Sequence, residues 1–408
     1  MWDVRTIDSS EADLFRRRVS RGFGRGGDAD VATRERFDAI VDLDRTLAAF
    51  DGRDIVGTCS AFPFGVTVPG GASVPMAGTT VITVQPTHRR MGVMRALMSA
   101  HLSDIAERGE PLAGLWASES SIYGRFGYAP ATYRHKSVID GRAVEVPTSP
   151  PPGQVVRFLE GEEIEPTVRA VYETIRPMAT GMLTRSDAWW KHRVLADPEE
   201  SRAGRSPHRH VLVEEDGHPV GYVTFRQKDR WEDFRPLGEV HVSEIMTVTA
   251  PARQALWRFL TNIDLFPTVE WWNMPVDELL PDLAPDFRSI RRTLADSLWV
   301  RLMSVEPALE QRRYEDGGEV VFEVADEMWP DNTGVYRLTV QDGRASCERS
   351  SSRPSLRFPI GVLGHLYLGG GNAITMADAG RIEGDEEAVI AIHRLFRTAR
   401  APWCPEVF

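Results

Sequence analysis

The sequence predicts an α/β chain with mixed sheets, in which two tandem copies of one unit are followed by a different third unit. Three observations support this prediction. A strand, a tight turn and an amphipathic helix follow one another over residues 81–105, and the same order returns in altered form over residues 240–263. After residue 303 the order of the predicted strands and helices no longer repeats that of the first two units. We therefore expect two related α/β units and then an α+β unit.

Length and composition indicate a soluble chain of several domains. Its 408 residues exceed one ordinary domain, and 42% apolar with 26% charged residues is typical of globular proteins. We find no membrane-spanning run and no signal peptide, so we expect a cytoplasmic protein without membrane partners. The three cysteines lie far apart without metal-ligand spacing, so we expect no metal and no disulfide. The net charge of −11 disfavours nucleic acid as a partner.

Apolar residues recur in a regular order along the first 146 positions. Alternation predicts strands, and recurrence every three to four residues predicts helices. The expected elements are a strand at 2–7, helices around 9–19 and 37–43, strands at 47–50, 54–68 and 73–84, a helix at 93–105, a strand at 111–116, a short helix at the following tyrosine motif and a strand at 132–139. This order suits a mixed sheet whose central strands splay to admit a ligand.

The turn that follows Val84 concentrates positive charge at the start of a helix. Arg89 and Arg90 stand directly before Gly92, where the helix begins. Free backbone N–H groups, the positive end of the helix and fixed charge therefore converge, which suits a phosphate. The alternative is an ordinary strand-to-helix turn with solvated arginines.

A second motif, Ile122-Tyr123-Gly124-Arg125-Phe126-Gly127-Tyr128, lies about thirty residues beyond the turn. Taken alone, Tyr123 reads as a half-buried core tyrosine. Together with the segment Arg89 to Met94, however, the motif resembles the GNAT superfamily of N-acetyltransferases, which bind acetyl-CoA. The resemblance implies that the Tyr123 hydroxyl faces the thioester sulfur.

Residues 147–153, Pro-Thr-Ser-Pro-Pro-Pro-Gly, have the composition of a linker, so we place a boundary there and assign the catalytic GNAT domain to residues 1–146. Beyond it the order of elements repeats, and the strand at 298–303 finishes the second unit. The turn of this copy, residues 249–255, contains no glycine and only one arginine, Arg253. We therefore expect residues 147–303 to form a second GNAT-like domain that is degenerate and non-catalytic.

The last third, residues 304–408, alternates helices and strands around turns at Asn332 and Asp342-Gly343. Helices are expected at 305–314, 360–367 and 386–397, and strands at 319–324, 334–340 and 345–349. This α+β pattern resembles a sterol-carrier-protein-like domain.

The chain ends with Ala-Pro-Trp-Cys-Pro-Glu-Val-Phe, an unusually apolar tail. Trp403, Val407 and Phe408 gain little from solvent, and two prolines lower the entropy lost on fixing the segment. We expect the tail to be docked, and hydrophobic anchoring without chemistry is the simpler alternative.

The chain resembles the Eis (enhanced intracellular survival) family of acetyltransferases. The resemblance lies in the combination of an active GNAT unit, an inert GNAT unit followed by a sterol-carrier-like unit, and an aromatic residue at the C-terminus. The specific matches are Pro86 to Gly92 and Ser118 to Thr132, and the resemblance covers essentially the whole chain. It implies acetylation of amines in aminoglycoside-like or polyamine substrates and a homo-hexamer. It also implies Tyr123 as general acid and the C-terminal carboxylate of Phe408 as general base.

The resemblance also implies which residues hold the co-substrate acetyl-CoA. The backbone of Ile82 and Val84 would bind the pantetheine arm, and the turn would bind the pyrophosphate. The full set carried over is Ile82, Thr83, Val84, Arg89, Arg90, Met91, Gly92, Val93, Met94, Arg95, Ser118 and Glu119.

For the amine substrate the sequence offers aromatic and acidic candidates, namely Phe23, Asp28, Phe37, Phe62, Trp116 and Glu406. Each aromatic taken alone would more often belong to a core. Arg25 and Val407 stand where the family carries acidic residues, which weakens the expectation of highly cationic antibiotics as substrates.

The chemistry needs few groups. A cationic amine must lose a proton before it attacks a thioester, and the departing thiolate must gain one. A tyrosine with an ordinary pKa near 10 can donate a proton, whereas an α-carboxylate near 3.5 is a weak base unless apolar neighbours raise its pKa. Two other functions remain open: a protein or peptide lysine acetyltransferase, and a lipid-binding carrier with a vestigial transferase domain.

Overall fold

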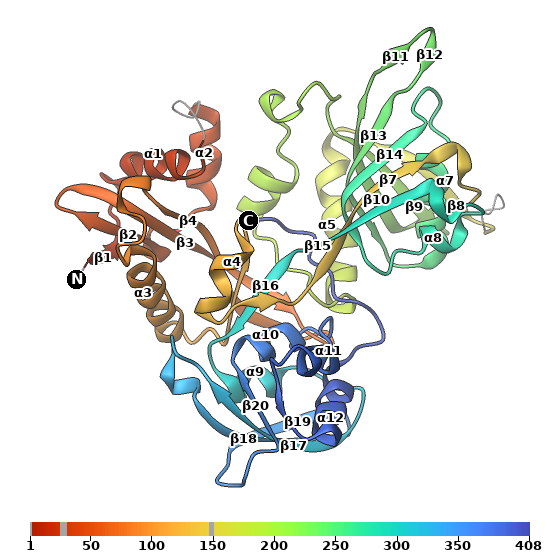
Figure 1. Ribbon diagram of the computed structural model, residues 1–408. Helices are drawn as coiled ribbons and strands as arrows, with labels where there is room; N and C mark the ends of the chain where they lie inside the picture. Colours follow the sequence, from red (N-terminus) through yellow and green to blue (C-terminus); the bar gives the residue numbers. More distant parts are fainter. Residues whose placement is uncertain (1, 25–30, 147–150) are drawn as a thin grey trace. The chain divides into compact units, whose positions relative to one another are not determined.

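The computed structural model describes residues 2–24, 31–146 and 151–408 (Figure 1). The chain forms two compact units, and neither is continuous in sequence. Unit 1 comprises residues 1–132, 183–194 and 297–408, and unit 2 comprises residues 133–182 and 195–296. Along the described ranges no helix is both long enough and apolar enough to cross a bilayer.

A seven-stranded mixed sheet forms the first half of unit 1. Its neighbours are antiparallel except for the parallel pair β4–β5. The strands in spatial order are β1 (Asp3–Thr6), β2 (Thr46–Asp51), β3 (Asp54–Thr67), β4 (Ser73–Val84), β5 (Leu112–Trp116), β16 (Leu298–Leu302) and β6 (Ala129–Pro130).

Helices cover both faces of this sheet, and the alternation of side chains along β2 shows how. Leu47 and Ala49 pack in one apolar cluster with α3 (Val93–Glu107), whereas Ala48 and Phe50 pack in another with α1 (Ala12–Gly22) and α2 (Val31–Ile40). Successive side chains of a strand point to opposite faces, so the two clusters lie on opposite sides. The short helix α4 (Ser120–Tyr123) follows β5.

One expectation about strand order is wrong. β16 does not finish the second unit but pairs along the whole of β5 in the first sheet, from Leu298↔Trp116 to Leu302↔Leu112. All five of its residues are buried, as expected for a strand in the middle of a covered sheet. Conversely β7 (Tyr133–Asp140), which we placed in the first domain, belongs to the sheet of unit 2. The contiguous segments 1–146 and 147–303 thus do not coincide with the two sheets.

Unit 2 is built on a second seven-stranded sheet, with the helices α5 (Ile164–Ile175), α7 (Ala250–Thr261) and α8 (Leu280–Leu283). The sequence patterns missed β14 and β15. In spatial order the strands are β15 (Ile290–Asp296), β7, β14 (Thr268–Pro275), β13 (Glu239–Thr247), β10 (His218–Lys228), β9 (Arg209–Glu215) and β8 (Gln154–Leu159), and a hairpin of β11 (Trp231–Glu232) and β12 (Arg235–Pro236) extends from them.

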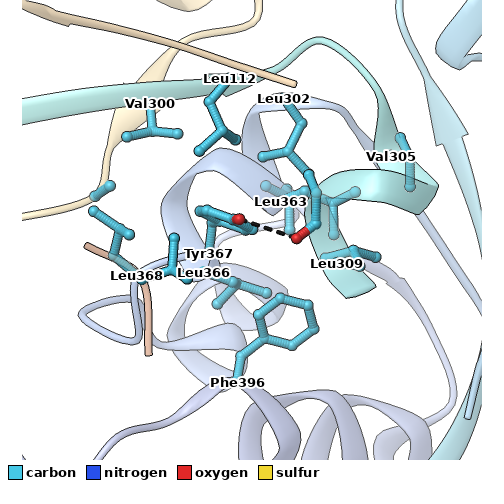
Figure 2. Close-up of a cluster of buried hydrophobic side chains, with 14 of the residues drawn as sticks. Leu112, Val300, Leu302, Val305, Leu309, Leu363, Leu366, Tyr367, Leu368 and Phe396 are labelled. Carbon is cyan, nitrogen blue, oxygen red and sulfur yellow. Dashed lines mark hydrogen bonds between the residues drawn. The ribbon is translucent and has the colours of Figure 1, made fainter. Parts of the chain in front are cut away.

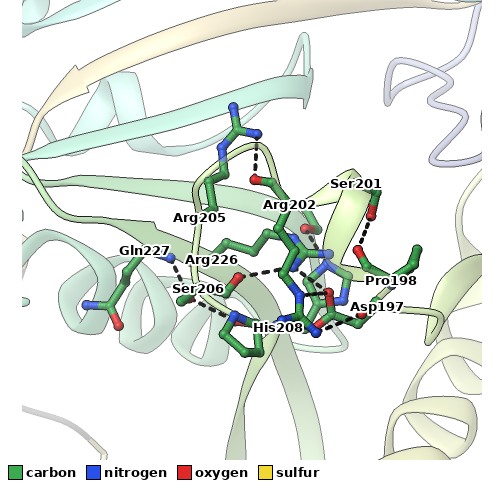
Figure 3. Close-up of polar contacts among 11 residues, drawn as sticks. Asp197, Pro198, Ser201, Arg202, Arg205, Ser206, His208, Arg226 and Gln227 are labelled. Carbon is green, nitrogen blue, oxygen red and sulfur yellow. Dashed lines mark hydrogen bonds and ion pairs between the residues drawn. The ribbon is translucent and has the colours of Figure 1, made fainter.

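A carboxylate at the centre of a polar cluster fixes the loop that precedes β9 (Figure 3). Asp197 accepts hydrogen bonds from the Arg226 and Arg202 guanidinium groups at 2.6 and 2.9 Å and from the His208 backbone N–H at 2.8 Å. Burial acts to raise the pKa of the Asp197 carboxyl, but these three partners outweigh it and lower the pKa to about 2. The loop is therefore held by an ionised carboxylate at neutral pH.

The remainder of unit 1 is the expected α+β fold. Its five strands in spatial order are β19 (Arg344–Arg349), β18 (Gly334–Gln341), β17 (Gly318–Ala325), β20 (Leu356–Pro359) and β21 (Glu383–Gly384). Its helices are α9 (Val305–Gln311), α10 (Gly361–Leu366), α11 (Ala373–Asp378) and α12 (Glu386–Phe396).

One apolar core joins this fold to the first sheet (Figure 2). Leu112 of β5 and Val300 of β16 pack with residues of α9, α10 and α12, and the Tyr367 hydroxyl donates a hydrogen bond of 2.9 Å to the Ala308 carbonyl. Gly364 allows the close approach, since a Cβ there would lie 2.2 Å from the Val300 carbonyl oxygen. The two folds therefore form one compact unit.

Candidate active site

The first sheet opens between β4 and β5, as the sequence led us to expect. The two strands pair only from Met76↔Leu112 to Gly78↔Gly114. Beyond Gly114, β5 continues beside β16, while β4 runs on for six residues with only β3 as its strand neighbour. From Thr79 onward one edge of β4 therefore presents backbone groups to the gap.

A β-bulge lies at this gap. Val81 has φ 46°, a value that a β-branched residue rarely adopts. Val81 and Ile82 stand opposite the single residue Cys59, and the Thr58 hydroxyl donates a hydrogen bond of 2.7 Å to the Val81 carbonyl. Strained backbone of this kind concentrates at functional sites, where it redirects backbone groups.

The arginine turn lies at the end of β4. Gly92 caps α3 in a left-handed conformation with φ 84°, and Arg90 also has positive φ, 63°. The Trp2 indole donates a hydrogen bond of 2.9 Å to the Met91 carbonyl and so helps to fix the turn. Among the described residues no ion pair involves Arg89 or Arg90, and both are exposed.

These features fit a diphosphate. The first backbone N–H groups of a helix lack partners within the helix and face outward at its positive end. Nothing lies within 4 Å of a Cβ built on Gly92, so the approach to these groups is open.

Tyr123 lies on the other side of the gap, at the end of α4. It is 4% exposed. Burial raises the pKa of its phenol, and a hydrogen bond with Ser118 opposes the shift. The phenol therefore holds its proton at neutral pH.

A buried arginine supports the tyrosine motif. Arg301 of β16 is fully buried, donates a hydrogen bond to the Phe126 carbonyl and forms an ion pair of 2.6 Å with Asp326. Gly127, with φ 80°, makes room for it, since a Cβ there would lie 1.8 Å from the guanidinium. Arg301 thereby ties the loop after Tyr123 to the C-terminal fold.

The tail reaches the same gap and is docked, as expected. The Phe408 ring lies 5.0 Å from the Phe64 ring, and the Arg193 guanidinium donates a hydrogen bond of 2.8 Å to the Val407 carbonyl. The prediction that Glu406 offers its charge to a substrate is wrong. Glu406 is 5% exposed, and its carboxylate accepts a hydrogen bond of 2.7 Å from the Trp189 indole and pairs with the buried Arg185.

A cavity of about 620 Å³ occupies the gap, within the usual size of a ligand pocket. Four of the expected substrate residues line it: Phe23, Phe37, Phe62 and Trp116. Tyr123 and Phe408, the two expected catalytic residues, line it together with Ile82 and Ser118. Asp28, like Arg25, falls outside the residues that the structure describes.

Other expected cofactor residues lie elsewhere. The Thr83 side chain is buried against Thr58, 2.8 Å between hydroxyl oxygens, so only its backbone can face a ligand. The residues from Arg89 to Arg95 form the turn and the start of α3 rather than the cavity wall. Glu119 precedes α4, and its carbonyl accepts a hydrogen bond from the Ile122 N–H at 3.1 Å.

Sequence patterns missed Trp189 and Arg193, which also line the cavity. They belong to α6 (Asp187–Trp189) and to the π-helical turn Trp190–Val194 that follows it. A β-bridge between Val66 and Leu183 and a 2.8 Å hydrogen bond from the Gly65 N–H to Thr184 hold this segment in unit 1. No local signal marks the segment, because its helical pattern is the same whichever sheet it joins.

In unit 2 the corresponding strand-to-helix junction is filled by side chains. Arg253, the single arginine of that turn, pairs with Glu278 and donates a hydrogen bond of 2.7 Å to the Ile245 carbonyl at the end of β13. Glu278 also accepts a hydrogen bond of 2.9 Å from the Trp257 indole. A larger cavity of about 1090 Å³ in unit 2 lies at the other end of α7, against Ala255 and Phe259, away from this junction.

Family models match three successive stretches of the chain. A model described as "Acetyltransferase (GNAT) domain" matches residues 3–131, a second with the same description matches residues 181–302, and a "Sterol carrier protein domain" matches residues 305–405. The expected fold class, two GNAT-like domains followed by a sterol-carrier-like domain, is confirmed.

Relatives that match over most or all of the chain support the same assignment. An uncharacterized N-acetyltransferase of Streptomyces avermitilis is 40% identical over 408 residues, covering 100% of this chain and 99% of the relative. N-acetyltransferase Eis of Mycobacterium tuberculosis is 36% identical over 81% of this chain and 80% of its own. The crystal structure of Eis1 from Mycobacterium abscessus superposes with a TM-score of 0.86 at 31% identity over both whole chains. The chain thus belongs to the Eis family of GNAT N-acetyltransferases.

Proposed function

We propose that this enzyme transfers an acetyl group from acetyl-CoA directly to the amine of a small molecule in the unit 1 cavity, with Tyr123 as general acid and the Phe408 carboxylate as general base. One observation supports this most: Tyr123 and Phe408 line the same cavity at the splay of β4 and β5.

Separate parts of the chain would bind the parts of acetyl-CoA, which supplies an acetyl group activated as a thioester. The turn of Arg89, Arg90 and Gly92 would hold the diphosphate. The open edge of β4 around Ile82 presents peptide groups that can pair with an extended amide arm, as an added strand would. This arrangement directs the end of the arm toward the gap that Tyr123 borders.

We assign the two catalytic roles from the positions of the two residues in the cavity wall. Because burial raises its pKa, the Tyr123 phenol keeps a proton for the departing thiolate. The Phe408 carboxylate, at the end of a tail whose last ring lies 5.0 Å from the Phe64 ring, would accept a proton from the substrate ammonium, directly or through water. Each role is worth about 10²–10⁴-fold in rate.

Release of free CoA, measured against a panel of amines, tests the proposal. Tyr123→Phe should lower kcat by about 10²-fold or more while acetyl-CoA still binds, whereas Tyr133→Phe in unit 2 serves as a matched control. Replacing the Phe408 carboxylate by a carboxamide, through protein ligation, should do the same, with the ligated natural carboxylate as control. Wild-type rates in either modified protein would remove that group from the mechanism.

Two finer expectations remain predictions. The homo-hexamer implied by the family resemblance can be measured by sedimentation. Aminoglycosides and polyamines are implied by the same resemblance, so they should be included in the amine panel.

A further inference from the structure

The β-bulge of β4 beside the gap is held by a buried threonine of the neighbouring strand. Thr58 of β3 is 0% exposed, and its hydroxyl donates a hydrogen bond of 2.7 Å to the Val81 carbonyl. β3 flanks β4 on the side opposite β5, whereas the gap lies on the β5 side. The hydrogen bond therefore draws the Val81 carbonyl away from the gap.

The protons of the threonine hydroxyls give this arrangement a direction. A hydroxyl has one proton to donate and can also accept hydrogen bonds. The hydroxyl oxygens of Thr58 and Thr83 lie 2.8 Å apart, and both residues are buried. Because Thr58 uses its proton for the Val81 carbonyl, Thr83 is the donor in this second contact. Thr83 thus orients Thr58, and Thr58 orients the carbonyl.

The conformation of Val81 is unfavourable by itself. Its φ of 46° is left-handed, where a bulge usually carries glycine and a β-branched side chain is strained. Such a conformation persists only where the surrounding structure determines it. The Thr58 hydroxyl contributes to this, because it stabilises only the orientation in which the Val81 carbonyl faces β3.

The bulge also changes which face of the sheet each side chain reaches. Ala77 packs in the cluster with α3, and in a regular strand Val81, four residues later, would reach the same face. Instead Val81 packs with Phe15 and Phe50 on the α1 side, and Ile82 takes the α3 side. The whole edge of β4 is therefore reoriented at the gap.

We propose that Thr58 is a positioning residue for acetyl transfer. By holding the Val81 carbonyl toward β3, its hydroxyl keeps this acceptor away from the thioester that enters the gap. The inference rests on the proposed function and adds a residue that acts through the β4 backbone without touching the substrate.

Charge in the transition state is the physical reason. When an amine attacks a thioester, the carbonyl oxygen of the thioester gains negative charge before the thiolate leaves. A backbone carbonyl aimed at that oxygen would raise the barrier, most strongly where water is excluded. The uncharged thioester of the ground state is affected less, so the effect belongs in kcat rather than in KM for acetyl-CoA.

Substitutions at Thr58 test this role. Thr58→Val keeps the shape of the side chain but removes the donor, so kcat should fall about tenfold or more, while KM for acetyl-CoA changes less than about threefold. Thr58→Ser keeps the hydroxyl and should retain kcat within about threefold of wild type. Thr67→Val is the matched control. Thr67 lies on the same strand, is 1% exposed and outside the cavity wall, and its hydroxyl has no hydrogen-bond partner within the described ranges.

A second measurement does not depend on turnover. Hydrogen–deuterium exchange of residues 79–85, with and without CoA, reports on the bulge directly. CoA should slow exchange in wild type and in Thr58→Ser, and should slow it less in Thr58→Val, where the bulge is no longer held. If Thr58→Val does not fold, Thr83→Val replaces it. That variant removes only the donor to Thr58 and should lower kcat by about threefold.

The outcomes separate this inference from the proposed function. Wild-type kcat in Thr58→Val, or a loss of kcat that Thr58→Ser or Thr67→Val shows equally, would overturn the positioning role and leave the proposed function standing. Absence of CoA release from wild type with every amine, with the protection of residues 79–85 still dependent on the Thr58 hydroxyl, would overturn the proposed function instead.

Discussion

The guanidinium of Arg301 donates a hydrogen bond to the backbone carbonyl of Phe126, although 175 positions separate them along the chain. Phe126 follows Tyr123 by three residues, and the same guanidinium is paired with Asp326 of the C-terminal fold. The tyrosine motif is therefore supported by a side chain of β16 that Asp326 of the sterol-carrier-like fold holds in place. This relationship gives that fold a part in positioning the active site.

The first prediction concerns this support. Arg301→Met leaves the Asp326 carboxylate buried without its cation, which should cost about 3–5 kcal/mol of unfolding free energy. In the double variant Arg301→Met/Asp326→Asn the stability should partly return, because the uncompensated charge is gone. The rate should not return: kcat should stay about tenfold or more below wild type, since the Phe126 carbonyl still lacks its donor.

Denaturant unfolding and steady-state kinetics of both variants check this prediction. A double variant that recovers kcat together with stability would show that Arg301 matters to the fold alone.

The second prediction concerns the docked tail. In Glu406→Gln the carboxylate that holds Arg185 and the Trp189 indole becomes a neutral amide, so the tail should loosen and kcat should fall about tenfold or more. The affinity for acetyl-CoA should change little, because the arginine turn, where we propose that the diphosphate binds, lies elsewhere. Glu387→Gln, at an exposed position of α12, is the control.

Limited proteolysis of the tail, run beside the kinetics, distinguishes loosening from a chemical effect. A tail that stays protected while kcat falls would contradict the positional role given to Glu406.

The third prediction concerns the arginine turn. Arg89→Gln and Arg90→Gln should each raise KM for acetyl-CoA several-fold, by about 1 kcal/mol per lost phosphate contact, and leave kcat at saturation nearly unchanged. Because exposed charge contacts are screened, the wild-type KM should rise with ionic strength and the variants' KM should rise less. Arg17→Gln is the control, and a KM for acetyl-CoA that neither substitution alters would place the diphosphate elsewhere.

The fourth prediction concerns acid stability. Burial lowers the pKa of His101 on α3 to about 4, and its ring nitrogen is hydrogen-bonded to Thr79 at 2.8 Å. A histidine with a folded pKa below the unfolded value of about 6.5 stabilises the fold above that value and loses this contribution as pH falls toward the folded pKa. Unit 1 should therefore lose stability between about pH 6.5 and about pH 4.

His101→Gln keeps a polar partner for Thr79 but does not titrate, so its melting temperature should depend less on pH over this interval. His218→Gln, at an exposed position of unit 2, should retain the wild-type dependence. Calorimetric scans across the interval make the comparison, and parallel curves for wild type and His101→Gln would refute the assignment.

Local patterns determined much of this protein. Apolar residues change from strand period to helical period after Val84, and two arginines and a glycine lie between the strand and the helix. Together with the tyrosine motif, these features predicted the splayed sheet and the two sides of its gap. Phe23 and Phe37 on the first helices, Phe62 on a strand and Trp116 beside the tyrosine motif were pocket candidates, and all four line the cavity. Such features are local because turn conformation and periodicity depend on neighbouring residues.

Only the tertiary structure decided which strand joins which sheet and which charges meet. β16 and β7 carry the same alternation in either sheet, since backbone hydrogen bonds are alike for every strand, and the partner depends on surfaces far away in the sequence. In the same way, the sequence made Glu406 a candidate substrate ligand, whereas the fold places it beside Arg185 and Trp189. Only the fold brings Arg34 and Arg193, which are far apart in the sequence, to one cavity. The energy of a charge is set by what surrounds it, and that is fixed only when the chain has folded.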